Sequence, residues 1–454
     1  MKGLLPIGLV SKQPIQQEPT LPDLPSAFSA IVLSFSSGFT KPTFARFLSL
    51  FIGLVVSSGR RTVLRTLSSM RELSHGHWSS YHRLFCKARW STLELGRILA
   101  RLVLAQIPED QAVVLAVDDT VTQHRGKNVW GKGCHRDAVR SSHSHTVWRW
   151  GHKWVVLVVS VPMPFCIMPW ALPVACALYK PREAGRHKTP CDLARQLLRL
   201  MERWFPKRRF ILLGDGGFNS HDFARSVARR SALVSRFYKG AVLHGLPVQS
   251  GRGRPRITGR RLPTPEAALK RARLREADVN WYGGQTRKVA LCSGKGYWYR
   301  QGRGLLWVRW VFVKDMIGTH RDEYFFTTDQ GLSEEEVVSL YTRRWPIEVM
   351  FQEARAQLGL NDSRQWKKAS VLRMTPSMFG LYSVIALLWR QAGVPRMPRT
   401  GYVKVHPTFS DAMEYARREL WEHTILNTPL LRPLLRNTPR RLLNPLLSHL
   451  ALAA

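Results

Sequence analysis

Residues 112–120 read AVVLAVDDT, six apolar residues followed by two carboxylates and a threonine. A short and nearly continuous apolar run is typical of a strand that is buried on both faces in the middle of a sheet. A second run of this kind, RFILLGDGGFNS at 209–220, ends in Asp215 and a glycine-rich turn. Between the two, the pattern predicts strands at 151–161 and 167–179 and a helix at 191–205. This order of elements predicts an α/β layer architecture with acids at the strand ends.

The rest of the chain differs from this core in pattern. Apolar residues recur at helical spacing before residue 108 and after residue 366, whereas short aromatic strands follow the basic loop around residue 255. We therefore predict a loosely ordered arm at 1–27, a helical DNA-binding domain at 28–108, the first part of the core at 109–238, a β-rich basic insertion at 239–323, the second part of the core at 324–365, and a helical basic region at 366–454. The basic stretch at 74–90 suits a DNA-contacting module, and a solvated basic face explains it equally well.

The net charge of the chain indicates what kind of molecule it binds. The 454 residues include 69 Lys and Arg against 31 Asp and Glu, a formal charge of +38, and 44% of them are hydrophobic. A globular chain with this excess is stabilised by a polyanion, and nucleic acid gains further from counterion release. An anionic membrane would need an anchor, but the charge-free stretch at 154–178 contains four prolines and favours strand–turn–strand. Six cysteines without a CxxC pair fit a reducing compartment, so we expect a cytoplasmic, bacterial, nucleoid-associated protein that binds no membrane.

Three acids stand where an α/β sheet places its site. Asp118 or Asp119 closes the first predicted strand, Asp215 closes the fourth, and Glu348 lies on a late helix. A cluster of like charges is costly unless cations neutralise it, and carboxylate oxygens suit Mg²⁺. A single acid after a strand is more often a helix cap or a turn former. Three acids in so basic a chain favour a site for metal-assisted phosphodiester chemistry.

The stretch YTRRWPIEVMFQEARAQLG at 341–359 adds cations to these acids. Tyr341, Arg344, Glu348 and Arg355 fall within about 60° of one another on a continuous helix. Pro346, however, fits the first turn of a new helix, which would put Tyr341 and Arg344 on a preceding turn. Alone, the stretch fits a charged site or an amphipathic surface helix with ordinary ion pairs.

The spacing Tyr-x2-Arg-x3-Glu-x6-Arg at 341–355 is similar to the Tyr-Arg-Glu-Lys signature of DDE transposases from bacterial cut-and-paste insertion sequences. VDDT at 117–120 and GDGGF at 214–218 resemble the two aspartate motifs of that family. The resemblance covers residues 110–365. It implies an RNase H-like mixed-sheet core that is split by a mostly β insertion and flanked by helical N-terminal and C-terminal regions.

The resemblance also implies roles for individual residues. Asp118, Asp215 and Glu348 would be the catalytic metal ligands, holding two Mg²⁺ ions for which Mn²⁺ could substitute. Asp118 aligns with the family motif better than Asp119, which stays the alternative. Tyr341 and Arg344 would contact the DNA of the element end. Arg355 stands where the family commonly has Lys, which keeps the charge but changes the geometry of phosphate contact.

The activity implied is that of a transposase, an endonuclease and strand transferase. It would bind the terminal inverted repeats of its element, cleave one strand and join the 3′-OH to target DNA. Its partners would be double-stranded DNA and a second copy of the chain in the DNA complex, with no small-molecule substrate. A catalytically inactive or repurposed transposase that only binds DNA is the alternative. Arg252, Arg254 and Arg256 resemble an AT-hook core for the minor groove, or form a general phosphate-binding linker. We interpret Trp148, Trp150 and Trp154 as packing residues rather than base-stacking platforms.

Overall fold

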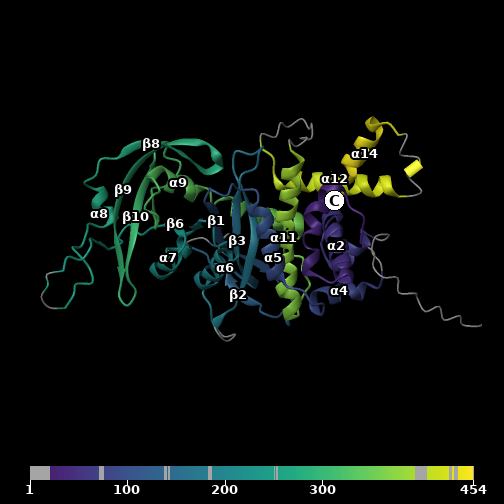
Figure 1. The fold of residues 1–454 in the computed structure, drawn as a ribbon, viewed down its shortest axis with the longest axis horizontal. Helices are drawn as coiled ribbons and strands as arrows, with labels where there is room; N and C mark the ends of the chain where they lie inside the picture. The colour runs from purple at the N-terminus through teal and green to yellow at the C-terminus, as the bar shows by residue number, and fades with distance from the viewer. Residues whose placement is uncertain are drawn as a thin grey trace, which may run out of the picture.

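The computed structural model describes residues 21–70, 76–137, 141, 144–182, 187–249, 251, 254–393, 406–428, 432–433 and 438–452. Most of the predicted arm at 1–27 therefore lies outside the described residues. Figure 1 shows three parts along the long axis: strands β8 to β10 at one end, the sheet around β1 and β3 in the middle, and the first and last helices of the chain at the other end.

The central strands form from the apolar runs that the sequence predicts. Val113 to Val117 are all buried, and Val155 to Val159 are almost completely so. The described core strands are β1 (Val113–Gln123), β2 (Gly133–Arg136), β3 (Trp148–Val161), β4 (Trp170–Tyr179), β5 (Phe210–Gly214) and β6 (Ala232–Arg236). Helices α6 (Pro190–Trp204) and α7 (His221–Val227) connect β4 to β5 and β5 to β6. The strand–turn–strand prediction for 154–178 is confirmed.

The order of the strands identifies the core. They lie in the order β4-β3-β1-β5-β6, with β5 parallel to β1 and β6 parallel to β5. β3 is antiparallel to both β1 and β4. Three antiparallel strands followed by parallel ones connected through helices form an RNase H-like core, and the expected fold class is confirmed.

The segment between the two parts of the core continues the same sheet. β11 pairs with β6, and β10, β9 and β7 follow it in an 11-stranded sheet, while β8 pairs with the other part of β9. The elements of this segment are β7 (Leu243–His244), α8 (Pro265–Leu269), β8 (Arg275–Asn280), β9 (Thr286–Arg300), β10 (Gly304–Asp315) and β11 (Glu323–Thr327). β11 thereby joins the segment to β6, the strand beside β5.

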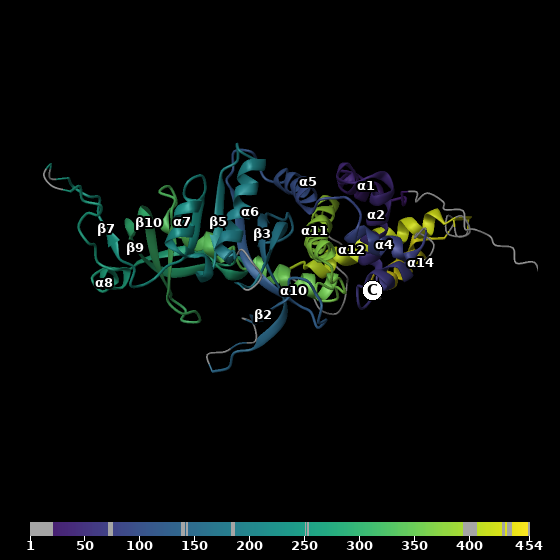
Figure 2. The same ribbon diagram turned by 90° about the horizontal axis from the view of Figure 1, so that it is seen from below.

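The N-terminal and C-terminal helices pack together although they are far apart in the sequence. α11 contacts α1, α4, α5 and β4, and α12 contacts α2 and α14. Figure 2 shows the first and last helices of the chain side by side. The N-terminal helices are α1 (Ser26–Leu33), α2 (Lys41–Val56), α3 (Val63–Ser68), α4 (Trp78–Cys86) and α5 (Thr92–Leu104), and the C-terminal ones are α11 (Lys368–Ala392), α12 (Phe409–Asn427) and α14 (Arg440–Leu452). Helices α9 (Glu334–Thr342) and α10 (Pro346–Leu358) lie between β11 and α11. The exact domain boundaries stay a prediction.

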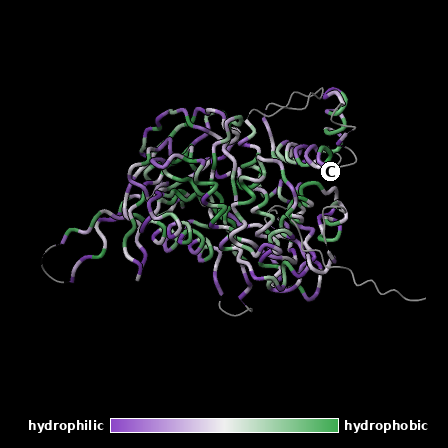
Figure 3. Tube along the Cα trace, turned by 45° about the vertical axis from the view of Figure 1, so that its right-hand side comes forward, coloured by the Kyte–Doolittle hydropathy of each residue, from purple (hydrophilic) through white to green (hydrophobic). Residues whose placement is uncertain are grey.

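α11 is the one described helix long and apolar enough to cross a membrane by length and composition. Most of it is buried within the fold, where it packs against the sheet and the N-terminal helices. Its apolar character is therefore accounted for by core packing. Figure 3 shows hydrophobic segments running through the interior and hydrophilic ones at the protruding loops.

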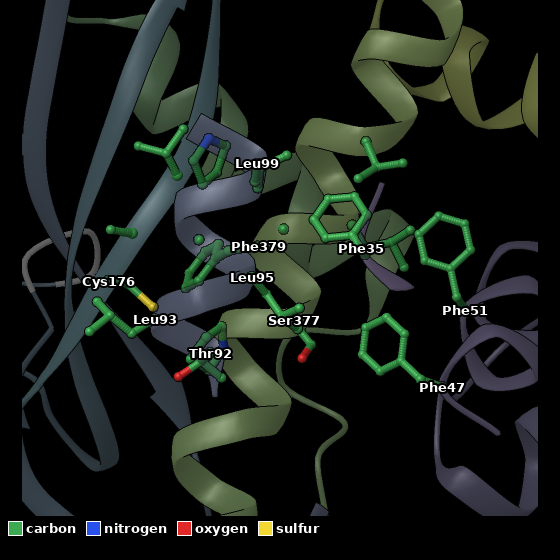
Figure 4. Close-up of a pocket in the computed structure, with 18 of the residues that line it drawn as sticks. Phe35, Phe47, Phe51, Thr92, Leu93, Leu95, Leu99, Cys176, Ser377 and Phe379 are labelled. Carbon is green, nitrogen blue, oxygen red and sulfur yellow. The ribbon is translucent and has the colours of Figure 1, made fainter. Parts of the chain in front are cut away.

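An apolar cavity of about 150 Å³ lies where the N-terminal helices, α11 and β4 meet. Figure 4 shows Phe35, Phe47, Leu95 and Phe379 around it, and no acidic or basic side chain lines it. A cavity whose polar side chains are only the hydroxyls of Thr92 and Ser377 fits imperfect packing between the helical parts and the sheet rather than a catalytic site.

The prediction that three tryptophans of β3 are packing residues is correct for Trp154, which is 1% exposed, and wrong for the other two. Trp148 and Trp150 are 62% and 58% exposed. The pairing of β3 with β4 begins only at Lys153, so the first residues of β3 extend beyond β4. Figure 2 shows this β2–β3 hairpin projecting from the body.

Candidate active site

Asp118 and Asp215 lie next to each other on neighbouring parallel strands. Val117 of β1 is in register with Gly214 of β5, so the residues that follow them are the two aspartates. The Asp215 carboxylate is oriented by the turn after β5, because its Oδ1 accepts the Gly217 N–H at 2.8 Å. The sheet thus brings together two of the three acids that the sequence singles out.

The structure separates Asp118 from Asp119. Successive residues of a strand point to opposite faces. Asp119 forms an ion pair with Lys153 Nζ of β3 at 2.9 Å, whereas Asp118 Oδ2 accepts a hydrogen bond from Arg344 Nη1 at 2.8 Å. Asp118 therefore shares its face of β1 with Arg344.

Arg344 connects Asp118 to Glu348. Helix α9 ends at Thr342 and α10 begins at Pro346, so the predicted break is confirmed and Arg344 lies in the short link. Its Nη2 donates to Glu348 Oε1 at 2.6 Å, while its Nη1 contacts Asp118. The Arg344 side chain is only 10% exposed. One guanidinium thus holds a strand acid and a helix acid together.

Burial and charge determine the protonation of this cluster. Burial raises the pKa of Asp118 to about 7; Arg344 opposes the rise and the neighbouring Asp215 adds to it. Burial alone would lower the pKa of Arg344, but the charge of Asp118, followed by Tyr341 and Glu348, outweighs it and the pKa lies above its usual value. Arg344 is thus a fixed cation beside a carboxyl group that resists ionisation.

The donor chemistry of the cluster fits a divalent metal, since all three acids supply hard oxygen ligands. Among the described residues, no three His, Cys, Asp or Glu side chains lie close enough to hold one ion together. The Arg344 guanidinium lies between two of the acids and supplies the positive charge there. The assignment of Asp118, Asp215 and Glu348 as metal ligands therefore stays a prediction.

We expect Arg344→Gln to lower the free energy of unfolding by about 1.5–3 kcal/mol in EDTA, the range for hydrogen bonds to charged groups. Mg²⁺ should then raise the melting temperature of the variant more than that of the wild type, because a bound cation replaces the missing charge. Thermal unfolding with EDTA or Mg²⁺ measures both effects. Arg343→Gln, at a half-buried neighbour, is the matched control. An equal Mg²⁺ shift in Arg344→Gln and wild type would contradict this role.

Tyr341 lies close to the cluster but is 1% exposed. Its ring stacks on Phe325 with a centroid distance of 4.2 Å, and its hydroxyl has no hydrogen-bond partner among the described residues. The guanidinium carbons of Arg236 and Arg344 lie 5.8 and 5.9 Å from the ring centre. The hydroxyl oxygen is itself buried, so a contact of Tyr341 with DNA would require its exposure, and the contact stays a prediction.

Arg355 lies farther along the same face of β1. Its Nη2 donates to Thr120 Oγ1, and Thr120 is two residues beyond Asp118 on the strand. α10 therefore runs along β1, with Glu348 joined to Asp118 through Arg344 and Arg355 bonded to Thr120. The half-buried Arg355 side chain is thereby fixed by a protein contact.

The loop arginines are not brought to the acids. Arg252 lies outside the described residues, whereas Arg254 and Arg256 are exposed on the loop between β7 and α8. Figure 1 shows this loop at the far end of the insertion. β7 lies six strands from β1, which is about 30 Å along the sheet at ~4.8 Å per strand. Their predicted DNA contact would be a separate one.

Several residues near the acids are not indicated by sequence motifs. Arg236 of β6 pairs with Glu323 of β11 at 2.6 Å. The exposed Trp345 packs edge-on against Tyr282 at a centroid distance of 6.1 Å. Lys153 reaches Asp119 only because of the β1–β3 register. Each contact depends on long-range pairing, and only Trp345, adjacent to Arg344, carries a local signal.

Comparison with known proteins gives matches on both parts of the core. The model of a family described as "DDE superfamily endonuclease" matches residues 34–288, and that of "Archaeal putative transposase ISC1217" matches residues 308–375. No curated protein matches. Among solved structures, a cryo-EM structure of the piggyBac transposase synaptic complex with hairpin DNA is similar at 14% identity and a TM-score of 0.38. The alignment covers 93% of this chain and 80% of that one.

The first match includes both Asp118 and Asp215 and spans more than half of the 454 residues. Enzymes of this superfamily generally use divalent metals. The chain belongs to the DDE superfamily endonucleases.

Proposed function

We propose that this protein is a DDE transposase with Asp118, Asp215 and Glu348 as its catalytic residues. The observation that carries the proposal is the juxtaposition of Asp118 and Asp215 at adjacent parallel strands, with Glu348 joined to Asp118 through Arg344. The Tyr-Arg-Glu-Lys-like spacing at 341–355 supports the same assignment. Lys153 neutralises Asp119 on the opposite face, which favours Asp118 as the ligand.

The reaction would begin with hydrolysis at the end of the element. Water attacks a phosphodiester, the P–O3′ bond breaks, and the products are a 3′-OH and a 5′-phosphate. In strand transfer the 3′-OH attacks a target phosphodiester, and the target 3′-oxygen leaves. Two Mg²⁺ ions, or Mn²⁺ in their place, would activate the attacking oxygen and stabilise the leaving one when bound to the three acids.

Arg344 and Tyr341 are the side chains that we expect to position the DNA. If these acids held a metal, Arg344 would no longer be needed to neutralise Asp118 and Glu348, and its guanidinium could then donate two hydrogen bonds to a phosphate. The Tyr341 hydroxyl, buried here and without a partner among the described residues, would be a second donor only if binding of DNA exposed it. The formal charge of +38 supplies the sequence-independent part of DNA affinity. A dimer would hold the two inverted repeats and the target, and the expected location is the bacterial cytoplasm.

A strand-transfer assay tests the proposal. The full-length protein is incubated in Mg²⁺ with linear DNA carrying the sequences on either side of its own coding region and with a supercoiled plasmid. We expect joining of the 3′ ends to the plasmid, detected by sequencing the junctions. Specific binding of these ends without nicking or joining would contradict the proposal and favour an inactive DNA-binding protein.

A further inference from the structure

A polar cavity, separate from the apolar one, lies beyond the C-terminal end of β1, the strand that carries Asp118. It has a volume of about 650 Å³. Three segments form it: residues 123–129 at and after the end of β1, residues 361–366 after α10, and Arg60 in the loop between α2 and α3. We call it the Arg–Trp pocket after its principal lining residues, Arg60, His124, Arg125, Arg364 and Trp366. Its size is within the range of small-ligand sites, roughly 300–1,000 Å³.

The side chains that line the Arg–Trp pocket carry a net positive charge. Arg60, Arg125 and Arg364 are exposed, and none of them forms an ion pair with another described residue. Asp362, the one carboxylate of the lining, accepts the Arg61 backbone N–H at 2.9 Å. Three cations thus face one carboxylate that already has a partner. Arginines without partners around a concave surface are suited to bidentate phosphate contacts.

Trp366 gives the Arg–Trp pocket an aromatic surface. Trp366 is 55% exposed, and its carbonyl accepts the Trp130 N–H at 2.9 Å, which fixes the backbone. Lys367 Nζ lies 5.1 Å from the ring centre. An exposed indole among cations is the combination with which proteins hold single-stranded nucleic acid, because every base can stack on it.

His124 supplies a buried polar atom that lacks a partner. The residue is 7% exposed, and its Nε2 has no hydrogen-bond partner in the described part of the chain. Burial and the neighbouring His152 and Lys132 lower the pKa of His124 to about 4, so its imidazole is neutral at pH 7. His124 thus contributes a neutral imidazole to the wall of the pocket, with a buried nitrogen that is costly to leave unpaired.

We propose that the Arg–Trp pocket binds an unpaired nucleotide of a DNA strand, with the phosphate on the arginines and the base stacked on Trp366. The inference rests on DNA being the substrate. Gln123, which also lines the pocket, is five residues beyond Asp118 on β1. That distance is about 16 Å at ~3.3 Å per strand residue, or roughly five nucleotide steps at ~3.4 Å each. A strand leaving the acids along β1 would therefore reach the pocket within a few nucleotides.

Binding in EDTA, which prevents cleavage, tests the proposal. The probes are a fluorescent oligothymidylate of about twelve nucleotides, within the ~4–16 nucleotide range of single-strand-binding folds, and a blunt duplex. We expect Trp366→Ala and the pair Arg125→Ala/Arg364→Ala to weaken single-strand binding about 5-fold or more relative to duplex binding. Trp366→Phe should keep the wild-type ratio, because it keeps a stacking ring. The pair Arg271→Ala/Arg273→Ala, exposed in the insertion, removes equal charge and should also keep the ratio.

The outcomes separate this proposal from the proposed function. Wild-type protein that binds neither probe would overturn the DNA function and the pocket with it. Normal binding of both probes with an unchanged ratio in the pocket variants would overturn only the pocket assignment. ATP binding that Trp366→Ala abolishes, with no change in oligothymidylate affinity, would show a site for free nucleotides and would also overturn it.

Discussion

Asp215→Asn should reduce Mg²⁺-dependent nicking of element-end DNA by more than about 100-fold, the upper range for disturbing outer-shell partners of a metal. Asp215 follows the buried strand β5, lies beside Asp118 and has its carboxylate fixed by the Gly217 N–H. The substitution keeps the shape of the side chain and its contact with this N–H through the amide oxygen. It removes one negative charge and one oxygen ligand, so binding of the DNA ends should persist while cleavage is lost.

Asp222→Asn is the matched control for this experiment. Asp222 lies on α7, just beyond the turn that follows Asp215, and pairs with Arg300 and Arg303 at the surface. Its loss removes the same charge without touching the cluster, and nicking should stay near the wild-type rate. Gel analysis of nicked plasmid containing the element ends gives the rates. Nicking by Asp215→Asn at the rate of Asp222→Asn would contradict the assignment.

Asp315→Ala should lower the free energy of unfolding by roughly 3–5 kcal/mol, the cost of removing one partner of a buried ion pair. Asp315 ends β10, and its side chain is 1% exposed. Arg287 of β9 donates to both of its oxygens at 2.6 and 2.5 Å, and the N–H groups of Ile317, Thr319 and His320 donate as well. The variant leaves Arg287 without its carboxylate and several N–H groups without an acceptor.

Urea denaturation followed by tryptophan fluorescence measures this loss, and hydrogen exchange of the β9 and β10 amides locates it. Asp278→Ala removes an exposed carboxylate of neighbouring β8 and should have little effect. An effect of Asp315→Ala no larger than that of Asp278→Ala would show that the pair does not stabilise the insertion.

The Asp315 carboxylate also makes the stability of the protein depend on pH. Hydrogen bonds from Arg287, followed by those from the three N–H groups, outweigh burial and hold the pKa of Asp315 well below its usual value. A carboxylate whose pKa is lower in the folded state stabilises the protein above its unfolded pKa of about 3.9. This contribution should therefore be complete at neutral pH and be lost as the pH falls below about 4. The loss should be absent in Asp315→Ala, whose stability would be flatter over this range.

The sequence predicts the centre of the fold well because local patterns determine it. The apolar runs before Asp118 and Asp215 are typical of buried strands, and the structure has both as β1 and β5. The capping box of Ser333 and Glu336 and the left-handed Gly359 correctly mark the limits of α9 and α10. Acids at the carboxyl ends of adjacent parallel strands lie close together because those ends are at the same edge of the sheet.

Features that depend on distant pairing could not be predicted. Nothing local indicates that β11 joins β6, so the insertion was expected without its continuation of the core sheet. The inward orientation of Arg344 depends on the angle between α9 and α10 and on the position of Asp118, 226 residues earlier. Trp150 and Trp154 have the same local pattern, and only the extent of β4 decides that one is exposed and the other buried.

Mn²⁺ binding, measured by electron paramagnetic resonance, tests most directly whether Asp118, Asp215 and Glu348 form one metal site. Carboxylate oxygens suit Mn²⁺, and its signal reports bound and free ions separately. We predict that the wild type and Asp119→Asn bind Mn²⁺, and that Asp118→Asn, Asp215→Asn and Glu348→Gln each lose this binding alike. Mn²⁺ binding at wild-type affinity in any of these three variants would contradict the account.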